Sequence, residues 1–140
     1  EPAERARLVA LLGRFREPGL AAAALELAAS PDTEPADAAA LLGEALQGRE
    51  TRPAALAALR RGWDGLVPRL SPGEAARLVE AAARPACDPA AHAEVAALLG
   101  PRVSALDGAA RSLDLGLEAA GQCAAARARG AGAVARLLGR

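Results

Sequence analysis

Apolar residues recur every three or four positions along most of this chain, the spacing that places them on one face of an α-helix. The clearest case is the stretch RETRPAALAALRRGWDGLVPRL, residues 49–70. Its apolar positions are Leu56, Leu59, Trp63, Leu66 or Val67, and Leu70. Trp63 is the only tryptophan, and we expect it to anchor the core because one buried indole removes roughly 150–250 Å² from water. Gly65 and Pro68 predict a bend or a short second helix after Trp63.

Prolines punctuate this pattern at nearly regular intervals. Pro18, Pro35, Pro53, Pro72 and Pro89 lie roughly 17 to 19 residues apart. Because proline is favoured in the first turn of a helix, each of them predicts a helix start. Two such helices occupy about 36 residues, close to the period of helical-hairpin repeats. We therefore predict an all-α fold, a HEAT- or armadillo-like helical-hairpin superhelix of about eight helices.

Turn and capping residues define the expected helix boundaries. Besides the two segments around Trp63, we expect helices over residues 2–16, 20–29, 35–47, 72–82, 89–100 and 108–129. Leu8, Leu11, Leu12 and Phe15 share one face of the first helix. Ser71 to Glu74 has the sequence of a capping box. Asp107 is expected to cap the long helix, which Gly130 and Gly132 should end before a short last helix with Val134, Leu137 and Leu138.

Length and composition fit one folded domain. The chain has 140 residues, of which 52% are hydrophobic and 24% charged, as in ordinary globular domains. Its formal net charge is zero, which removes the positive field expected of a dedicated nucleic-acid binder. No apolar run approaches the roughly 20 residues of a membrane span. We interpret residues 1–140 as a single helical-repeat domain, the C-terminal fragment of a longer chain, because the sequence starts without Met directly in helical pattern.

The basic residues are all arginines. There are 17 of them and no lysine, alongside many alanines, glycines and prolines. These four amino acids share GC-rich codons, so the bias favours a high-GC bacterial genome over selection for arginine chemistry.

Three stretches carry a resemblance to a known family. They are RETRPAALAALRRGWDGLVPRL, SPGEAARLVEAAARPACDPAAHAEVAALLGPRV and ARSLDLGLEAAGQCAAARARGAGAVARLLG. In this order they resemble the C-terminal helical domain of zinc aminopeptidases of the alanyl, puromycin-sensitive and endoplasmic-reticulum type, over about the last 100 residues. The matching positions are Arg52, Trp63, Asp64, Glu94, Val95, Leu113 and Leu117.

The resemblance implies a non-catalytic, HEAT-like domain that covers the active-site chamber of a catalytic domain in the same chain and helps to bind and size-select peptides. The family's Gly-Ala-Met-Glu-Asn and His-Glu-x-x-His motifs are absent from these residues. Zinc is therefore expected in the parent enzyme and no cofactor in this fragment. The alternative is a stand-alone helical-repeat module that binds a protein partner.

His92 is the only histidine. A catalytic zinc site needs three protein ligands, commonly including two histidines, and an open position. We therefore interpret His92 as a surface or packing residue and expect no catalytic or metal residue here. A Cys–His pair of His92 with Cys87 or Cys123 is the only nucleophile arrangement that the residues allow.

The two cysteines leave two alternatives open. Cys87 precedes a helix start and Cys123 lies in the long helix, so antiparallel packing could bring them together. A disulfide would contribute on the order of 3 to 4 kcal/mol by the loop-entropy estimate and would indicate an exported, periplasmic or secreted parent enzyme. Two small buried thiols would instead fit a cytoplasmic one.

Clustered arginines are the remaining candidates for peptide contact. Arg60 and Arg61, and the C-terminal set Arg127, Arg129, Arg136 and Arg140, could form a basic face toward peptide carboxylates. The alternative is a set of solvated side chains paired with nearby acids.

Overall fold

The structure is a computed structural model that describes residues 2–139, and all its regular elements are helical. They are α1 (Pro2–Leu12), α2 (Pro18–Ala29), α3 (Pro35–Gln47), α4 (Arg52–Leu66), the 3-10 helix η1 (Val67–Arg69), α5 (Pro72–Ala83), α6 (Pro89–Val103) and α7 (Ala109–Leu137). Residues 2–139 contain no strand. The predicted all-α fold is thus confirmed, with seven α-helices and one 3-10 helix in the described range.

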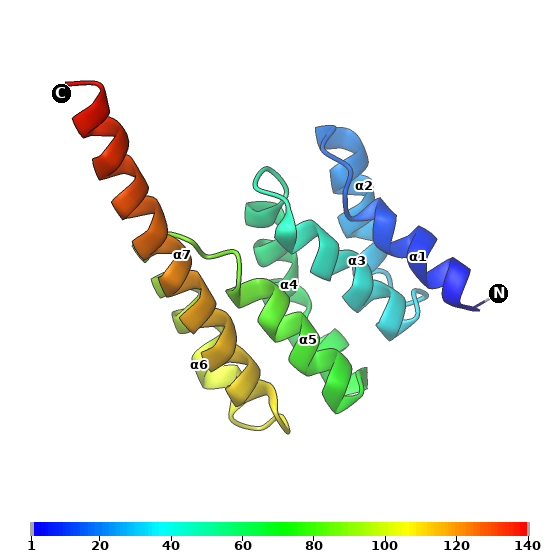
Figure 1. Ribbon diagram of the computed structural model, residues 1–140. Coiled ribbons are helices and arrows are strands. Elements are labelled where there is room, and N and C mark those ends of the chain that lie inside the picture. Colours follow the sequence, from blue (N-terminus) through cyan, green and yellow to red (C-terminus); the bar gives the residue numbers. More distant parts are fainter. Residues whose placement is uncertain (1, 140) are drawn as a thin grey trace.

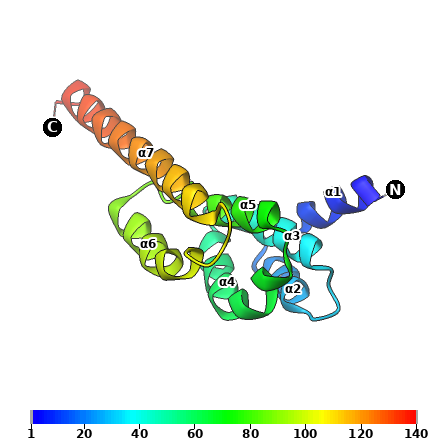
Figure 2. The same ribbon diagram turned by 90° about the horizontal axis from the view of Figure 1, so that it is seen from below.

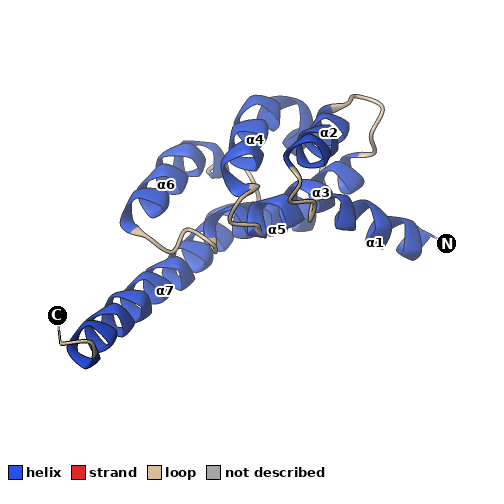
Figure 3. Cartoon of the chain, turned by 90° about the horizontal axis from the view of Figure 1, so that it is seen from above, coloured by secondary structure: helices blue, strands red, loops and turns tan. Residues whose placement is uncertain are grey.

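The helices form two layers of a short superhelix. Figure 1 shows α1, α3, α5 and α7 side by side and roughly parallel, with α7 extending past its neighbours. Figures 2 and 3 show α2, α4 and α6 as a second layer that follows the outside of the arc. Each odd-numbered helix packs directly on the next one, whereas α4 and α6 have few contacts with each other. The odd-numbered helices are therefore the inner layer, and the even-numbered helices are the outer layer.

Two glycines allow the inner helices to approach closely. A Cβ atom at Gly13 would overlap the carbonyl oxygen of Leu41 on α3. A Cβ atom at Gly116 on α7 would lie 2.6 Å from the Cβ of Ala83 on α5. Any side chain at these positions would push the helices apart.

The predicted start signals act as expected. Proline stands in the first turn of α2, α3, α4, α5 and α6. The Asp88 side chain accepts a hydrogen bond from the Ala91 backbone N–H, which caps α6. The capping box of α5 is confirmed, because Ser71 accepts from the Glu74 N–H while the Glu74 carboxylate accepts from the Ser71 N–H. These contacts satisfy backbone donors that would otherwise be unpaired at a helix start.

The core is aliphatic apart from one indole. Trp63 on α4 is only 6% exposed and belongs to a continuous cluster of buried side chains from α2 to α7. Leu56, Leu59 and Leu66 on the same face of α4 are also buried, as the spacing predicts. The expected short element after Trp63 is present as η1, which contains Pro68.

The first helix differs from its prediction. It ends at Leu12 instead of Arg16, where the chain turns at Gly13 beneath α3. Leu8, Leu11 and Phe15 are 59%, 48% and 38% exposed. Only one side of α1 packs on α3, which leaves Leu8 and Leu11 outside the core, and Phe15 lies beyond the end of the helix.

Two other predicted boundaries and one predicted cap are wrong. α6 continues past Gly100 and through Pro101 to Val103, because Val103 is buried in the core and the proline lies in the last turn. α7 starts after Gly108, which has a φ of 73°, and Asp107 does not cap it. Gly130 does not end α7, which runs as one helix to Leu137 and stops before Gly139, whose φ is 68°. The separate last helix is therefore absent.

The capping box of α5 predicts that the free energy of unfolding depends on pH. Hydrogen bonds from the Ser71 hydroxyl and backbone hold the pKa of Glu74 below its ordinary value of 4.5. A lowered pKa stabilises the folded state above pH 4.5, and this contribution is lost as the pH falls through the folded-state pKa. Glu74→Gln should thus cost about 0.3–1 kcal/mol at pH 7 and progressively less below pH 4.5.

The measurement is urea unfolding at pH 7, 5, 4 and 3. Glu26→Gln serves as the control, because Glu26 lies in the second half of α2, away from a helix start. A cost of Glu74→Gln that stays constant down to pH 3 would contradict the assigned hydrogen bonds.

Candidate functional site

A groove crosses the inner layer between α1, α3 and α5. Its volume is about 520 Å³, and small residues form its floor: Ala36, Ala40, Gly43 and Ala81. The charges beside it are mostly paired, with Arg14 Nε at 2.8 Å from Glu44 Oε2 and Arg84 at 3.1 Å from Glu80 Oε1. We call this feature the inner groove. A shallow, small-residue floor leaves room for an extended chain.

A second cavity of about 820 Å³ lies where α3 and α5 end, beside the second half of α7. Its lining includes Arg49, Arg52, Arg127 and the acid Asp88. We call it the arginine cleft. Gln47 lines both cavities, so the inner groove and the cleft adjoin at this residue. Three cations against one acid make the cleft suited to an anion.

Arg52 is held in place by the backbone. Its guanidinium donates to the carbonyl oxygen of Leu46 at 3.1 Å and to that of Ala82 at 2.5 Å, which joins the C-terminal ends of α3 and α5. Thr51 is buried beside it and donates to the Ala45 carbonyl at 2.6 Å. Burial lowers the pKa of Arg52, and the charges of Glu94 and Asp88 partly oppose this shift. Arg52 is thus a structural clamp that also places positive charge in the cleft wall.

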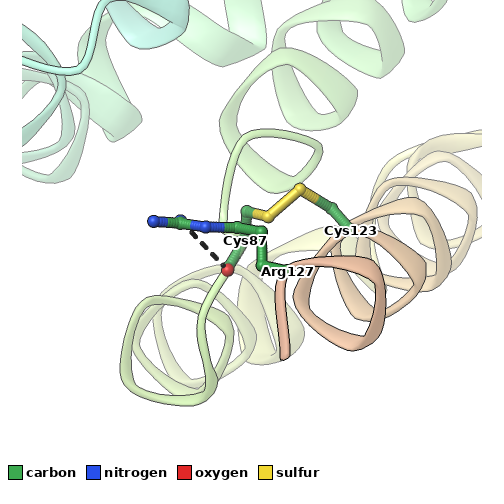
Figure 4. Close-up of a disulfide and its surroundings, with 3 residues drawn as sticks. All are labelled: Cys87, Cys123 and Arg127. Carbon is green, nitrogen blue, oxygen red and sulfur yellow. Dashed lines mark hydrogen bonds between the residues drawn. A yellow bond between two sulfur atoms is a disulfide. The ribbon is translucent and has the colours of Figure 1, made fainter. Parts of the chain in front are cut away.

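Arg127 comes to the cleft from α7. Its Nη1 donates to the carbonyl oxygen of Cys87 at 3.5 Å. Figure 4 draws this hydrogen bond as a dashed line. The structure joins Cys87 to Cys123, one helical turn before Arg127, by a disulfide with a Cα–Cα distance of 5.3 Å. This link ties α7 to the loop before α6. Arg127 is exposed, and within residues 2–139 neither it nor Arg49 forms an ion pair. Both guanidiniums are therefore available to a ligand.

The other predicted residues do not form one basic face. Arg60 pairs with Glu94 at 3.8 Å, whereas Arg61 faces a different cavity on the outer layer. Arg129 and Arg136 are exposed on the extended half of α7. The prediction for Arg140 lies outside the described residues. His92 is half-buried on α6, and residues 2–139 hold no group of three or more His, Cys, Asp or Glu side chains that could bind a metal ion.

Sequence reasoning missed the role of Arg49 and the backbone contacts of Arg52. Both lie in the segment GRETRP, which runs from the end of α3 into the first turn of α4. Arginine just after a helix C-terminus is well placed to contact the free carbonyls there, and this rule could have indicated Arg52. No sequence rule places Arg127 opposite Arg49, because that requires the packing of α7 on α5.

Comparison with known proteins identifies the family. The family model described as the ERAP1-like C-terminal domain matches residues 1–121. The chain therefore belongs to this family, the C-terminal domain of ERAP1-like aminopeptidases, and the resemblance seen in the sequence is confirmed. Membership implies a catalytic domain in the same chain. No curated protein and no solved structure matched the chain.

None of the helices within residues 2–139 has the length and apolar character of a membrane-spanning segment.

Proposed function

We propose that this domain caps the active-site chamber of a zinc-dependent aminopeptidase and helps to bind and size-select its peptide substrates. The family match supports the placement in an aminopeptidase. Any zinc site would belong to the catalytic domain, since residues 2–139 offer no suitable ligand group. The role of this domain is then to hold the part of the peptide distant from the scissile bond.

The observation that carries the peptide contact is that the inner groove and the arginine cleft adjoin at Gln47. An extended peptide on the groove floor would direct its C-terminal carboxylate toward Arg49 and Arg127. Guanidinium groups bind carboxylates with two parallel hydrogen bonds when the geometry allows. Peptides too short to reach from the catalytic centre to the cleft would lose this contact, which gives selection by length.

The experiment compares Arg49→Gln and Arg127→Gln in the full-length enzyme. Each should raise the KM for a long peptide with a free carboxylate about fivefold, because an exposed charged contact is worth roughly 1 kcal/mol. The same peptide with an amidated C-terminus should show no such change, and neither should a small aminoacyl reporter. Arg129→Gln is the matched control, because Arg129 is exposed on the same helix but does not line the cleft.

Two results would contradict the carboxylate contact. One is an equal rise of KM for the free and the amidated peptide. The other is a KM of Arg127→Gln that equals that of Arg129→Gln. Either result would show that the peptide's C-terminal carboxylate is not bound in the arginine cleft. The family assignment would not be affected.

A stand-alone interaction module remains the alternative. It is favoured by the apolar side chains exposed at the two ends of the arc, including Leu8 and Leu11 on α1 and Leu137 on α7. The two functions differ in what precedes this domain. A His-Glu-x-x-His motif upstream in the full open reading frame supports the aminopeptidase, and its absence supports the module.

A further inference from the structure

The outer layer contains two gaps between neighbouring helices, and they are built differently. Between α4 and α6 an ion pair spans the gap, with Arg60 Nη2 at 3.8 Å from Glu94 Oε1. Between α2 and α4 no ion pair between described residues spans the gap. A cavity of about 320 Å³ lies there, which we call the outer pocket.

The floor of the outer pocket is apolar. It is formed by Leu25, Ala38, Leu42, Leu59 and Leu66, from α2, α3 and α4. All except Leu25 are buried in the core cluster. The volume lies at the lower end of the range for small-molecule sites. Such a floor accepts an aliphatic chain without leaving polar groups unpaired.

The polar side chains that line the outer pocket are two arginines and two hydroxyls, and only the hydroxyls have hydrogen-bond partners among the described residues. Arg61 and Arg69 line it, and neither forms an ion pair or a side-chain hydrogen bond to a described residue. No carboxylate is among the lining residues. The two hydroxyls are already bonded to the backbone: Ser30 Oγ accepts from the Asp32 N–H at 3.3 Å, and Thr33 Oγ1 donates to the Leu27 carbonyl at 2.7 Å.

We propose that the outer pocket binds a small amphipathic carboxylate, a medium-chain fatty acid such as octanoate. The aliphatic chain would lie on the leucine floor, and the carboxylate would be bound by Arg61 and Arg69. A peptide fits less well, because each of its amide groups needs a hydrogen-bond partner, whereas the floor is apolar and the two hydroxyls each already make one hydrogen bond to the backbone. The ligand that matches the lining has one charged end and an apolar remainder.

The first test uses calorimetric titration of the full-length protein with octanoate. Gly62 lines the pocket, and a Cβ atom added there meets no other atom within 4 Å. Gly62→Leu should therefore fill the pocket while favouring the helix, since glycine is a poor helix former. It should reduce octanoate affinity at least tenfold. Gly121→Leu is the matched control, because Gly121 also lies in a helix with open space around it, on α7.

The second test separates the contribution of the ligand's carboxylate from that of its aliphatic chain. Hexanoate, which is two methylenes shorter, should bind about tenfold more weakly than octanoate. The double variant Arg61→Gln and Arg69→Gln should weaken octanoate binding but leave octanol binding unchanged. Arg60→Gln, which removes the cation of the other gap, should change neither.

Undiminished octanoate binding by Gly62→Leu would overturn the proposal. The proposal would also be overturned if a short peptide ending in leucine bound more strongly than octanoate and Gly62→Leu abolished binding of that peptide. The outer pocket and the inner groove lie on opposite layers, so this inference and the proposed function can fail separately. Activity on long peptides should be the same for Gly62→Leu and wild type.

Discussion

Trp63→Ala is expected to lower the free energy of unfolding by about 3 to 5 kcal/mol, the usual cost of removing a large aromatic side chain from a core. Trp63 is 6% exposed, and every neighbouring core residue is aliphatic. Leucines, valines and alanines fixed in helices cannot refill the volume of an indole without moving those helices. Since a domain of this size has roughly 5 to 15 kcal/mol in total, the variant should be close to unfolding.

The measurement is thermal unfolding followed by far-ultraviolet circular dichroism, because the variant lacks the only tryptophan. At roughly 3 °C per kcal/mol, the midpoint should fall by about 10 °C or more. Asp64→Ala is the control, since Asp64 is exposed on the same helix turn. A midpoint of Trp63→Ala within a few degrees of the Asp64→Ala value would show that Trp63 does not anchor the core.

Replacing Cys87 and Cys123 together by serine should have an effect of similar size. The structure closes a loop of 36 residues between them. The loop-entropy estimate for that length is about 4 kcal/mol. The change should also release α7 from the loop before α6, so that hydrogen exchange near Arg127 becomes faster.

Alkylation shows whether the bond forms in the protein. Iodoacetamide should label neither cysteine until a reductant is added, and the reduced wild type should then unfold at the same midpoint as the double serine variant. Full labelling of both cysteines without reductant, in protein folded under oxidising conditions, would rule out the disulfide. The expectation of an exported parent enzyme, which depends on the disulfide, would then lose its support.

The helices could be predicted because their start signals are local. A proline with a capping side chain before it, as at Asp88 and Pro89, acts through its own backbone and needs no distant partner. The face of α4 was predictable for the same reason, since Trp63 and its neighbouring leucines follow the helical period.

Helix ends were less predictable because they depend on packing. Gly130 and Gly132 resemble a stop, yet the alanines and arginines around them favour a helix and the backbone stays helical. The helix was expected to end at Gly100, but Val103 is buried in the core and α6 continues to it. Likewise, the cleft could not be predicted, because Arg49 and Arg127 are 78 residues apart in sequence and line one cavity only because α7 packs on α5.

The superhelix also suggests how the domain moves. Each helix pair packs mainly on its neighbours, so the arc should move as one semi-rigid body against a catalytic domain. An open form would admit peptide, and a closed form would exclude water and fix the length of the bound substrate.

The most direct test of the size-selecting role is to delete residues 1–140 from the full-length enzyme and measure cleavage against peptide length. Circular dichroism and zinc content first establish that the truncated enzyme is folded and loaded with metal. Cleavage of long peptides and its dependence on length should be lost, while hydrolysis of a small aminoacyl reporter should be largely retained. An equal loss on both substrates in a folded, zinc-loaded enzyme would contradict the size-selecting role.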